Sequence, residues 1–218
     1  MYEQTSRYSV TPRAQASSTT KLLGQVSFLV AAALGVATLG TFAGRDLSNG
    51  AAFACTIAAF GMLLVQSFAG QRFRVGSFAI FWLGLIALLI GLGIGPTINY
   101  YSQVDPAAVT EAAGGTALTV LGMGSLGFFL SKDLAPWMRP LSLAVFVLVV
   151  VAIGVMIFSG ALSPFLSLLI YGISAALIMV NFNYLRKHGT EDDAVWLATG
   201  IFVSIINIFL SLLNILRN

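Results

Sequence analysis

TEDDAVWLATGIFVSIINIFLSLLNILR, residues 190–217, is the stretch that decides the fold. Its apolar part is long enough to cross a bilayer, which takes roughly 20 helical residues at about 1.5 Å each. Small and polar residues recur in it at a spacing that places them within one narrow arc of a helix: Asp193, Gly200, Ser204, Asn207, Ser211 and Asn214. A helix in lipid hides such a stripe against protein, because its Ser and Asn side chains need hydrogen-bond partners. We therefore predict a final transmembrane helix inside a bundle, with packing as the simplest role of the stripe.

The composition indicates an integral membrane protein. The chain has 218 residues, of which 58% are hydrophobic and only 9% are charged, against about 25% in a typical soluble domain. Its net charge of +3 does not indicate a nucleic-acid partner, because the basic residues stand between apolar segments, where membrane topology explains them. Cys55 and His188 are the only residues of their types. We therefore predict no cofactor, no metal site and no enzymatic activity.

Seven apolar runs predict seven transmembrane helices and an all-α fold. The runs are Leu22–Ala43, Ala51–Ala69, Val75–Ile98, Ala107–Leu130, Trp137–Phe158, Leu162–Leu185 and Asp193–Leu216. The first run is longer than the apolar part of a signal peptide, which has about 7–15 residues, so we expect it to be retained. Residues 1–21 are polar and lack a hydrophobic period, which predicts a disordered tail before a transmembrane domain of residues 22–218.

The distribution of Lys and Arg predicts the orientation of these helices. With the N-terminus in the cytoplasm, the following residues are cytoplasmic: Arg7, Arg13, Lys21, Arg72, Arg74, Lys132, Arg139, Arg186 and Lys187. Only Arg45 and Arg217 then lie outside. Because basic residues concentrate on the cytoplasmic side of membrane proteins, we predict a cytoplasmic N-terminus and an external C-terminus.

Glycines inside the apolar runs predict close contacts between helices. Residues 122–127, GMGSLG, match the GxGxxG pattern of dinucleotide-binding loops, but they lack a preceding strand and lie deep in an apolar run. We interpret them, together with Gly84, Gly91 and Gly95, as packing positions. Gly95-Pro96 also predicts a break or kink near the outer end of the third helix, which serves either packing or a cavity.

Three further polar features have a structural and a functional interpretation. Thr190 and Asp193 have the spacing of a capping box at the start of the last helix, although the acidic cluster could also bind a cation. Glu111 lies about one turn below the outer surface, where it either reaches water or binds a proton or cation. Ser167, Ser174 and Asn181 repeat every seven residues in the sixth run, and this spacing predicts that they face the stripe of the last helix.

Several segments resemble the Bax inhibitor-1 (transmembrane Bax inhibitor motif) family. The resemblance covers roughly residues 22–217 and is most specific in GPTINYY at 95–101, EAAGGTA at 111–117 and SIINIFLSLL at 204–213. It implies seven transmembrane helices, the last of them central and surrounded by the other six. The end of the chain is most similar to the bacterial YccA-like branch, which modulates the membrane AAA protease FtsH.

The family's pH-sensitive calcium leak depends on paired aspartates in the sixth and seventh helices. Here Asn181 and Ser204 stand at the matching positions, and the second run contains no arginine to pair with them. The first hypothesis is therefore a modulator of FtsH in the bacterial inner membrane, whose tail is gripped while its stable bundle resists extraction. The alternative is a leak for Ca²⁺ or H⁺, with Glu111, Asn181, Ser204 and Asn207 as lining candidates. A purely structural role in a membrane complex is a third possibility.

Overall fold

The computed structural model describes residues 12–68, 70–159 and 162–217, and the regular elements of these residues are helices. The long helices are α1 (Pro12–Ala43), α2 (Asn49–Phe68), α3 (Gly76–Val104), α4 (Pro106–Phe129), α5 (Ala135–Ser159), α6 (Pro164–Lys187) and α7 (Ala194–Leu216). Two short 3-10 helices, η1 (Gln71–Phe73) and η2 (Glu191–Asp193), precede α3 and α7. Seven helices of the described chain are long and apolar enough to cross a membrane, which confirms the predicted fold class.

The first and third helices extend beyond the predicted apolar runs. Helix α1 begins at Pro12, so residues 12–21 of the predicted tail are helical, and residues 1–11 lie outside the described residues. Proline is well tolerated in the first turn of a helix, because the amide hydrogen that it lacks has no partner there. Helix α3 continues through Pro96 to Val104, so the predicted break at Gly95-Pro96 is absent.

Helices α1 and α3 share the most extensive contact in the bundle, and small residues bring their backbones together. A Cβ atom built on Gly91 would lie 2.2 Å from the carbonyl oxygen of Ala37. One built on Gly95 would lie 2.6 Å from the carbonyl carbon of Gly44. At Gly84, by contrast, a Cβ atom would have no neighbour within 4 Å. The predicted packing role therefore holds for Gly91 and Gly95, whereas Gly84 makes no such contact.

The GxGxxG segment lies inside α4 and serves helix packing. A Cβ atom on Gly127 would lie 2.0 Å from the carbonyl oxygen of Met179 in α6. Gly124 faces the ring of Phe182, and only Gly122 has open space beside it. Two of the three glycines are thus required for the close approach of α4 and α6, as helix packing in membranes predicts.

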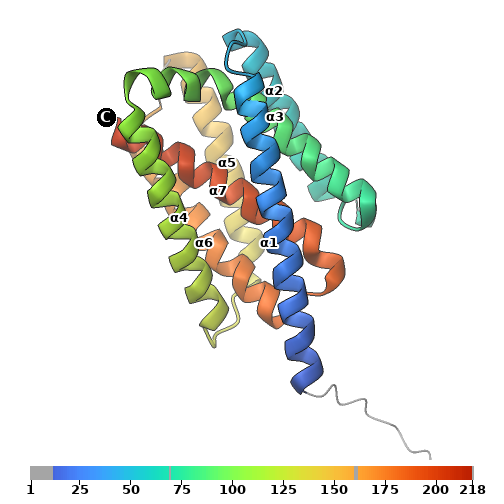
Figure 1. Ribbon diagram of the computed structural model, residues 1–218. Coiled ribbons are helices and arrows are strands. Elements are labelled where there is room, and N and C mark those ends of the chain that lie inside the picture. Colours follow the sequence, from blue (N-terminus) through green and yellow to red (C-terminus); the bar gives the residue numbers. More distant parts are fainter. Residues whose placement is uncertain (1–11, 69, 160–161, 218) are drawn as a thin grey trace, which may run out of the picture.

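Helix α7 runs through the middle of the view in Figure 1 and is the most buried of the seven, with half of its span buried. It packs against α6, α4 and α1, and less extensively against α3. Helix α5 is the least buried span, at 6%. Helices α2 and α5 line a cavity beside α7, described below. The arrangement in which all six other helices surround α7 therefore remains a prediction.

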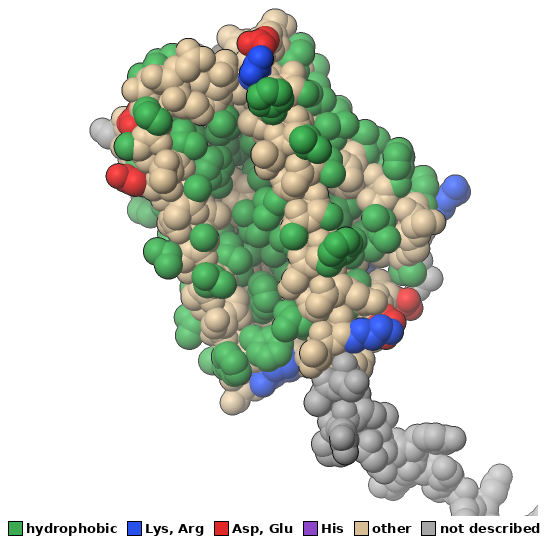
Figure 2. Space-filling model, viewed as in Figure 1, with side chains coloured by type: hydrophobic (Ala, Val, Ile, Leu, Met, Phe, Trp, Pro, Cys, Tyr) green, Lys and Arg blue, Asp and Glu red, His purple; other side chains and the backbone are tan. Residues whose placement is uncertain are grey.

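Contacts of charged side chains gather at one end of the bundle. At one end Lys21 Nζ lies 2.7 Å from Glu191 Oε1, Arg74 lies over the ring of Trp196, and Arg186 donates a hydrogen bond to the carbonyl of Leu130. Figure 2 shows charged side chains near the margins of the face drawn, with hydrophobic side chains across its middle. This apolar band is the surface that a bilayer covers.

Candidate functional site

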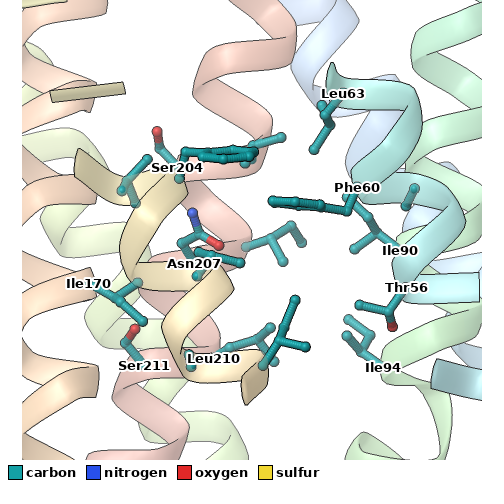
Figure 3. Close-up of a pocket in the computed structure, with 18 of the residues that line it drawn as sticks. Thr56, Phe60, Leu63, Ile90, Ile94, Ile170, Ser204, Asn207, Leu210 and Ser211 are labelled. Atoms are coloured by element: carbon teal, nitrogen blue, oxygen red, sulfur yellow. The ribbon is translucent and has the colours of Figure 1, made fainter. Parts of the chain in front are cut away.

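A cavity of about 560 Å³ lies beside α7, between it and helices α2, α3, α5 and α6. Figure 3 shows its two walls: Ser204, Asn207 and Ser211 of α7 lie on one side, and apolar side chains of α2 and α3 lie on the other. The labelled residues of the apolar wall are Phe60, Leu63, Ile90 and Ile94, with Thr56 among them. The stripe predicted from the sequence therefore faces this cavity as well as neighbouring helices.

The predicted capping box is present and caps η2, the short helix that leads into α7. The backbone amide and the hydroxyl of Thr190 both donate to Asp193 Oδ2, at 2.9 and 2.8 Å, and the amide of Asp193 donates to the carbonyl of Thr190 at 3.0 Å. This confirms the prediction. Asp193 is not among the residues that line the cavity, because its carboxylate accepts from Thr190 in the turn before α7.

Asn181 and Ser204 converge on Gly200. The hydroxyl of Ser204 donates to the carbonyl of Gly200 at 2.8 Å, and a Cβ atom on Gly200 would lie 3.3 Å from Asn181 Oδ1. Both side chains line the cavity, and their residues are only 5% and 3% exposed. The amide of Asn181 donates to the carbonyl of Leu177 at 2.8 Å. The structure thus brings Asn181 and Ser204 close to the same residue of α7, and neither side chain carries a charge.

A polar contact between α2 and α7 lies at the same end of the cavity. Gln66 Nε2 donates to Thr199 Oγ1 at 3.1 Å, and both residues are buried. The other side-chain atom, Gln66 Oε1, has no hydrogen-bond partner among the described residues. In the sequence Gln66 is only a polar residue in an apolar run. Its partner, Thr199, could be identified only from the packing of α2 beside α7.

The other end of the cavity combines α6, α7 and the end of α3. Asn214 Nδ2 donates to the carbonyl of Leu162 at 3.2 Å and to the hydroxyl of Ser167 at 2.9 Å. The face predicted for α6 thus supplies a hydrogen-bond partner to α7 through Ser167 and lies against Gly200 at Asn181. The third predicted residue, Ser174, is buried, and its hydroxyl has no hydrogen-bond partner among the described residues. Arg217 lies over the ring of Tyr101, 5.1 Å from its centroid, and donates to its hydroxyl.

The structure separates the predicted lining residues. Asn181, Ser204 and Asn207 line the cavity, whereas Glu111 is exposed on α4 and is not among the lining residues. Of the lining residues, which all belong to the described part of the chain, only Arg217 carries a charge. No group of three or more His, Cys, Asp and Glu side chains within the described ranges could hold a metal ion. The chemistry that this cavity offers is neutral hydrogen bonding with one cation at its end.

Asn183 has a structural role that the sequence did not predict. Its residue is fully buried, and its side chain binds the connection between α4 and α5. Asn183 Oδ1 accepts from the amide of Leu134 at 2.8 Å. Its Nδ2 donates to the carbonyls of Gly127, Leu130 and Lys132 at 3.0 to 3.2 Å. In α6 the seven-residue spacing predicted a polar face of Ser167, Ser174 and Asn181, and Asn183 does not belong to that face.

The same connection carries a His–Asp pair that the sequence did not predict. His188 Nε2 lies 2.9 Å from Asp133 Oδ2, and both side chains are partly exposed. The pKa of Asp133 lies below its usual value, first because the backbone amide of Ala135 donates to the carboxylate and then because His188 also bonds to it. The carboxylate is therefore stabilised in its ionised form.

Comparisons with known proteins agree with this architecture. The chain matches the family described as "Inhibitor of apoptosis-promoting Bax1" over residues 19–218. It is also similar to an uncharacterized membrane protein of Vibrio cholerae, with 28% identity over 206 residues, which covers 91% of this chain and 89% of the relative. The family match includes α7 and every residue that lines the cavity.

Proposed function

The chain belongs to the Bax inhibitor-1 family, and from this premise we propose that it is a bacterial inner-membrane modulator of the membrane AAA protease FtsH. In this proposal it inhibits the degradation of membrane proteins during quality control. Its N-terminus lies in the cytoplasm and its C-terminus lies outside. The proposal continues the hypothesis from the sequence, in which the YccA-like branch of the family was the most similar.

The observation that favours modulation over an ion leak is that the two side chains beside Gly200 are uncharged. Asn181 and Ser204 both lie close to Gly200, and neither side chain ionises. By the resemblance, these are the positions at which the family's leak has two aspartates. The lining of the cavity also contains no carboxylate among the described residues. A pore that opens and closes with pH needs a titrating group in its path. The lack of a carboxylate in the described lining therefore supports a role that does not require conduction.

The mechanism assigns different tasks to the N-terminal segment and to the bundle. An AAA protease pulls on an accessible segment, and the polar residues before α1 are the candidate. The bundle then resists extraction, because α1 is held by backbone contact with α3 at Ala37 and Gly91. An ion pair between Lys21 and Glu191 links the start of α1 to the α6–α7 connection, although an exposed pair of this kind adds little stability.

The test measures the lifetime of a membrane substrate of FtsH with and without this protein. The proposal expects the protein to co-purify with FtsH and to lengthen the half-life of the substrate. Deleting residues 2–11 leaves every described helix intact and is expected to abolish this protection. If the shortened chain protects as well as the full chain, the gripping mechanism is wrong. If neither chain changes the half-life, the proposed function is wrong.

A cation leak remains the second candidate, and the length of the cavity favours it. Lining residues follow α7 from Trp196 to Arg217. At about 1.5 Å per residue, this distance is close to the roughly 30 Å thickness of the hydrocarbon core. A cavity of this length is the geometry that a transmembrane pathway requires.

The double substitution Asn181→Asp with Ser204→Asp tests this candidate. Two carboxylates that converge on Gly200 would share a proton and titrate as a coupled pair. In proteoliposomes we expect pH-dependent Ca²⁺ flux from the double variant and little pH dependence from the native chain. Glu111→Gln, on the exposed face of α4, is the control and should change neither result. A strongly pH-gated Ca²⁺ flux from the native protein would place the leak above protease modulation.

A further inference from the structure

The cavity beside α7 has the size of a ligand site. Small-molecule sites have volumes of roughly 300–1,000 Å³, and this cavity has about 560 Å³. A close-packed membrane bundle does not leave such a space empty without a penalty, because the lining atoms lose their contacts. Either water or an apolar molecule must therefore fill it.

The hydrogen bonds of the wall favour an apolar occupant. The hydroxyls of Thr56, Thr199 and Ser204 donate to backbone carbonyls of their own helices, at 3.1, 2.8 and 2.8 Å. A buried water molecule needs about two to four polar partners. The donor hydrogens of these three hydroxyls are already used, and Gln66 Oε1 is a buried lining atom at this end that still lacks a partner. The wall opposite α7 is apolar at Phe60 and Ile90 (Figure 3). A hydrocarbon chain needs no hydrogen bonds and fits this wall.

The charge at the end of the cavity indicates the headgroup. Arg217 is the one charged residue among the described lining residues, and it lies beside the hydroxyl of Tyr101. A guanidinium group has five N–H donors and binds a carboxylate through two of them at once. The amide of Asn207 faces the cavity farther along α7 (Figure 3). No carboxylate in the described lining opposes an anion at this end.

The side of the cavity toward α2 and α5 is where a chain could enter from the bilayer. Helix α5 is the least buried span, and an aromatic pair joins it to α2: the rings of Phe60 and Phe146 stack with their centroids 4.8 Å apart. Both rings line the cavity. A chain that enters between α2 and α5 would therefore meet these two rings.

We propose that this cavity binds a long-chain fatty acid, with its carboxylate at Arg217 and its hydrocarbon chain against the apolar wall that α2 and α3 form opposite α7. A chain of one leaflet reaches about 15 Å, half of the roughly 30 Å hydrocarbon core, so it extends from Arg217 to about Asn207. This site goes beyond modulation of a protease and does not depend on it. Its occupant would fill the space that otherwise separates α7 from α2 and α5.

The experiment uses the full chain in phosphatidylcholine nanodiscs and a palmitate probe with a photoactivatable group in mid-chain. Mass spectrometry of the labelled protein should locate the adducts on lining residues of α2 and on the C-terminal half of α7. Unlabelled palmitate should compete with the probe, whereas hexadecanol, which lacks the carboxylate, should compete about tenfold less well. Adducts confined to outward-facing side chains would overturn the proposal, and this map requires no variant to fold.

Two pairs of matched variants test the site further. Val149→Phe fills the cavity from α5, whereas Val150→Phe adds the same ring to a residue that is 45% exposed and does not line the cavity. Only the first should lower labelling, by about tenfold.

Arg217→Gln should weaken palmitate binding by a similar factor, whereas Arg45→Gln, at an arginine that does not line the cavity, should not. Equal effects within either pair, or equal competition by hexadecanol, would overturn the proposal.

Discussion

At the scale of single residues, the amide of Asn183 determines how the α4–α5 connection is held. One side chain supplies both an acceptor for Leu134 and a donor for three carbonyls. Polar groups buried without partners are costly, so a residue that satisfies several at once contributes more than its own bonds. Neither hydrophobic period nor motif marks it, because its partners lie about fifty residues away in the sequence.

Asn183→Ala should destabilise the protein by about 1–3 kcal/mol, because it leaves the buried amide of Leu134 without its acceptor. The measurement is the thermal unfolding of the purified protein in detergent. Asn99→Ala is the control: its amide donates one 3.4 Å bond to the carbonyl of Arg45, and its loss should cost less than about 0.5 kcal/mol. Similar costs for the two variants would contradict the role given to Asn183.

Asp133 should make the stability of this connection depend on acid pH. Its pKa in the folded state is below the ordinary value of 3.8, so its contribution is complete above that value. The contribution is lost as the pH falls through the lower folded-state pKa. The stability difference between the native chain and Asp133→Asn should therefore shrink between pH 5 and pH 2. A difference that grows on acidification would show that the carboxylate is not stabilised in its charged form.

At the scale of helices, the close contact between α1 and α3 shows what a sequence predicts and what it does not. The length of the apolar runs was enough to predict seven spans, because a bilayer sets the same minimum length for each. The glycines in α3 looked equivalent in the sequence. The structure distinguishes them, since Gly91 touches the backbone of Ala37 while Gly84 faces open space. Which glycine packs depends on the rotation of the helix, which composition does not determine.

Gly91→Ala should destabilise the bundle by about 1–3 kcal/mol, because the added methyl group would overlap the carbonyl of Ala37. Gly84→Ala adds the same methyl group to the same helix without a neighbour within 4 Å. It should be neutral within about 0.5 kcal/mol. Unfolding of the two variants in the same detergent makes the comparison. Alanine favours a helix more than glycine does, so a loss for Gly84→Ala that equals the loss for Gly91→Ala would contradict the packing role given to Gly91.

At the scale of the whole molecule, the helices bring distant basic residues to one end. Lys21 of α1 contacts Glu191 in the α6–α7 connection, Arg74 in the α2–α3 connection contacts Trp196 of α7, and Arg186 of α6 contacts Leu130 in the α4–α5 connection. This grouping agrees with the predicted sides of the Lys and Arg residues. The side of the membrane on which each end lies stays a prediction. Reporter fusions should place the N-terminus in the cytoplasm and Asn218 outside, and a cytoplasmic signal from the C-terminal fusion would contradict this orientation.

The candidate site was predicted in part. The stripe of α7 and its partner face in α6 follow from helical spacing, and Ser167, Asn181 and Ser204 lie where that spacing indicates. The cavity itself could not be predicted, because it depends on how far α2 and α5 stand from α7. Glu111 looked like a lining candidate from its depth alone. It lies on the exposed face of α4. The rotation of that helix could not be predicted, because its apolar residues are spread over all of its faces.

The bonds of Asn183 also bear on the order in which the chain is made. A ribosome completes residues 127–134 before it reaches Asn183, so the α4–α5 connection is made before its amide partner exists. During that interval water must solvate the backbone groups that Asn183 later binds. A ribosome-stalled nascent chain that ends before α6 should therefore expose this connection to added protease, and one that extends past α6 should protect it. The connection between the fourth and fifth helices therefore reaches its final structure only after the sixth helix has been synthesised and has packed against it.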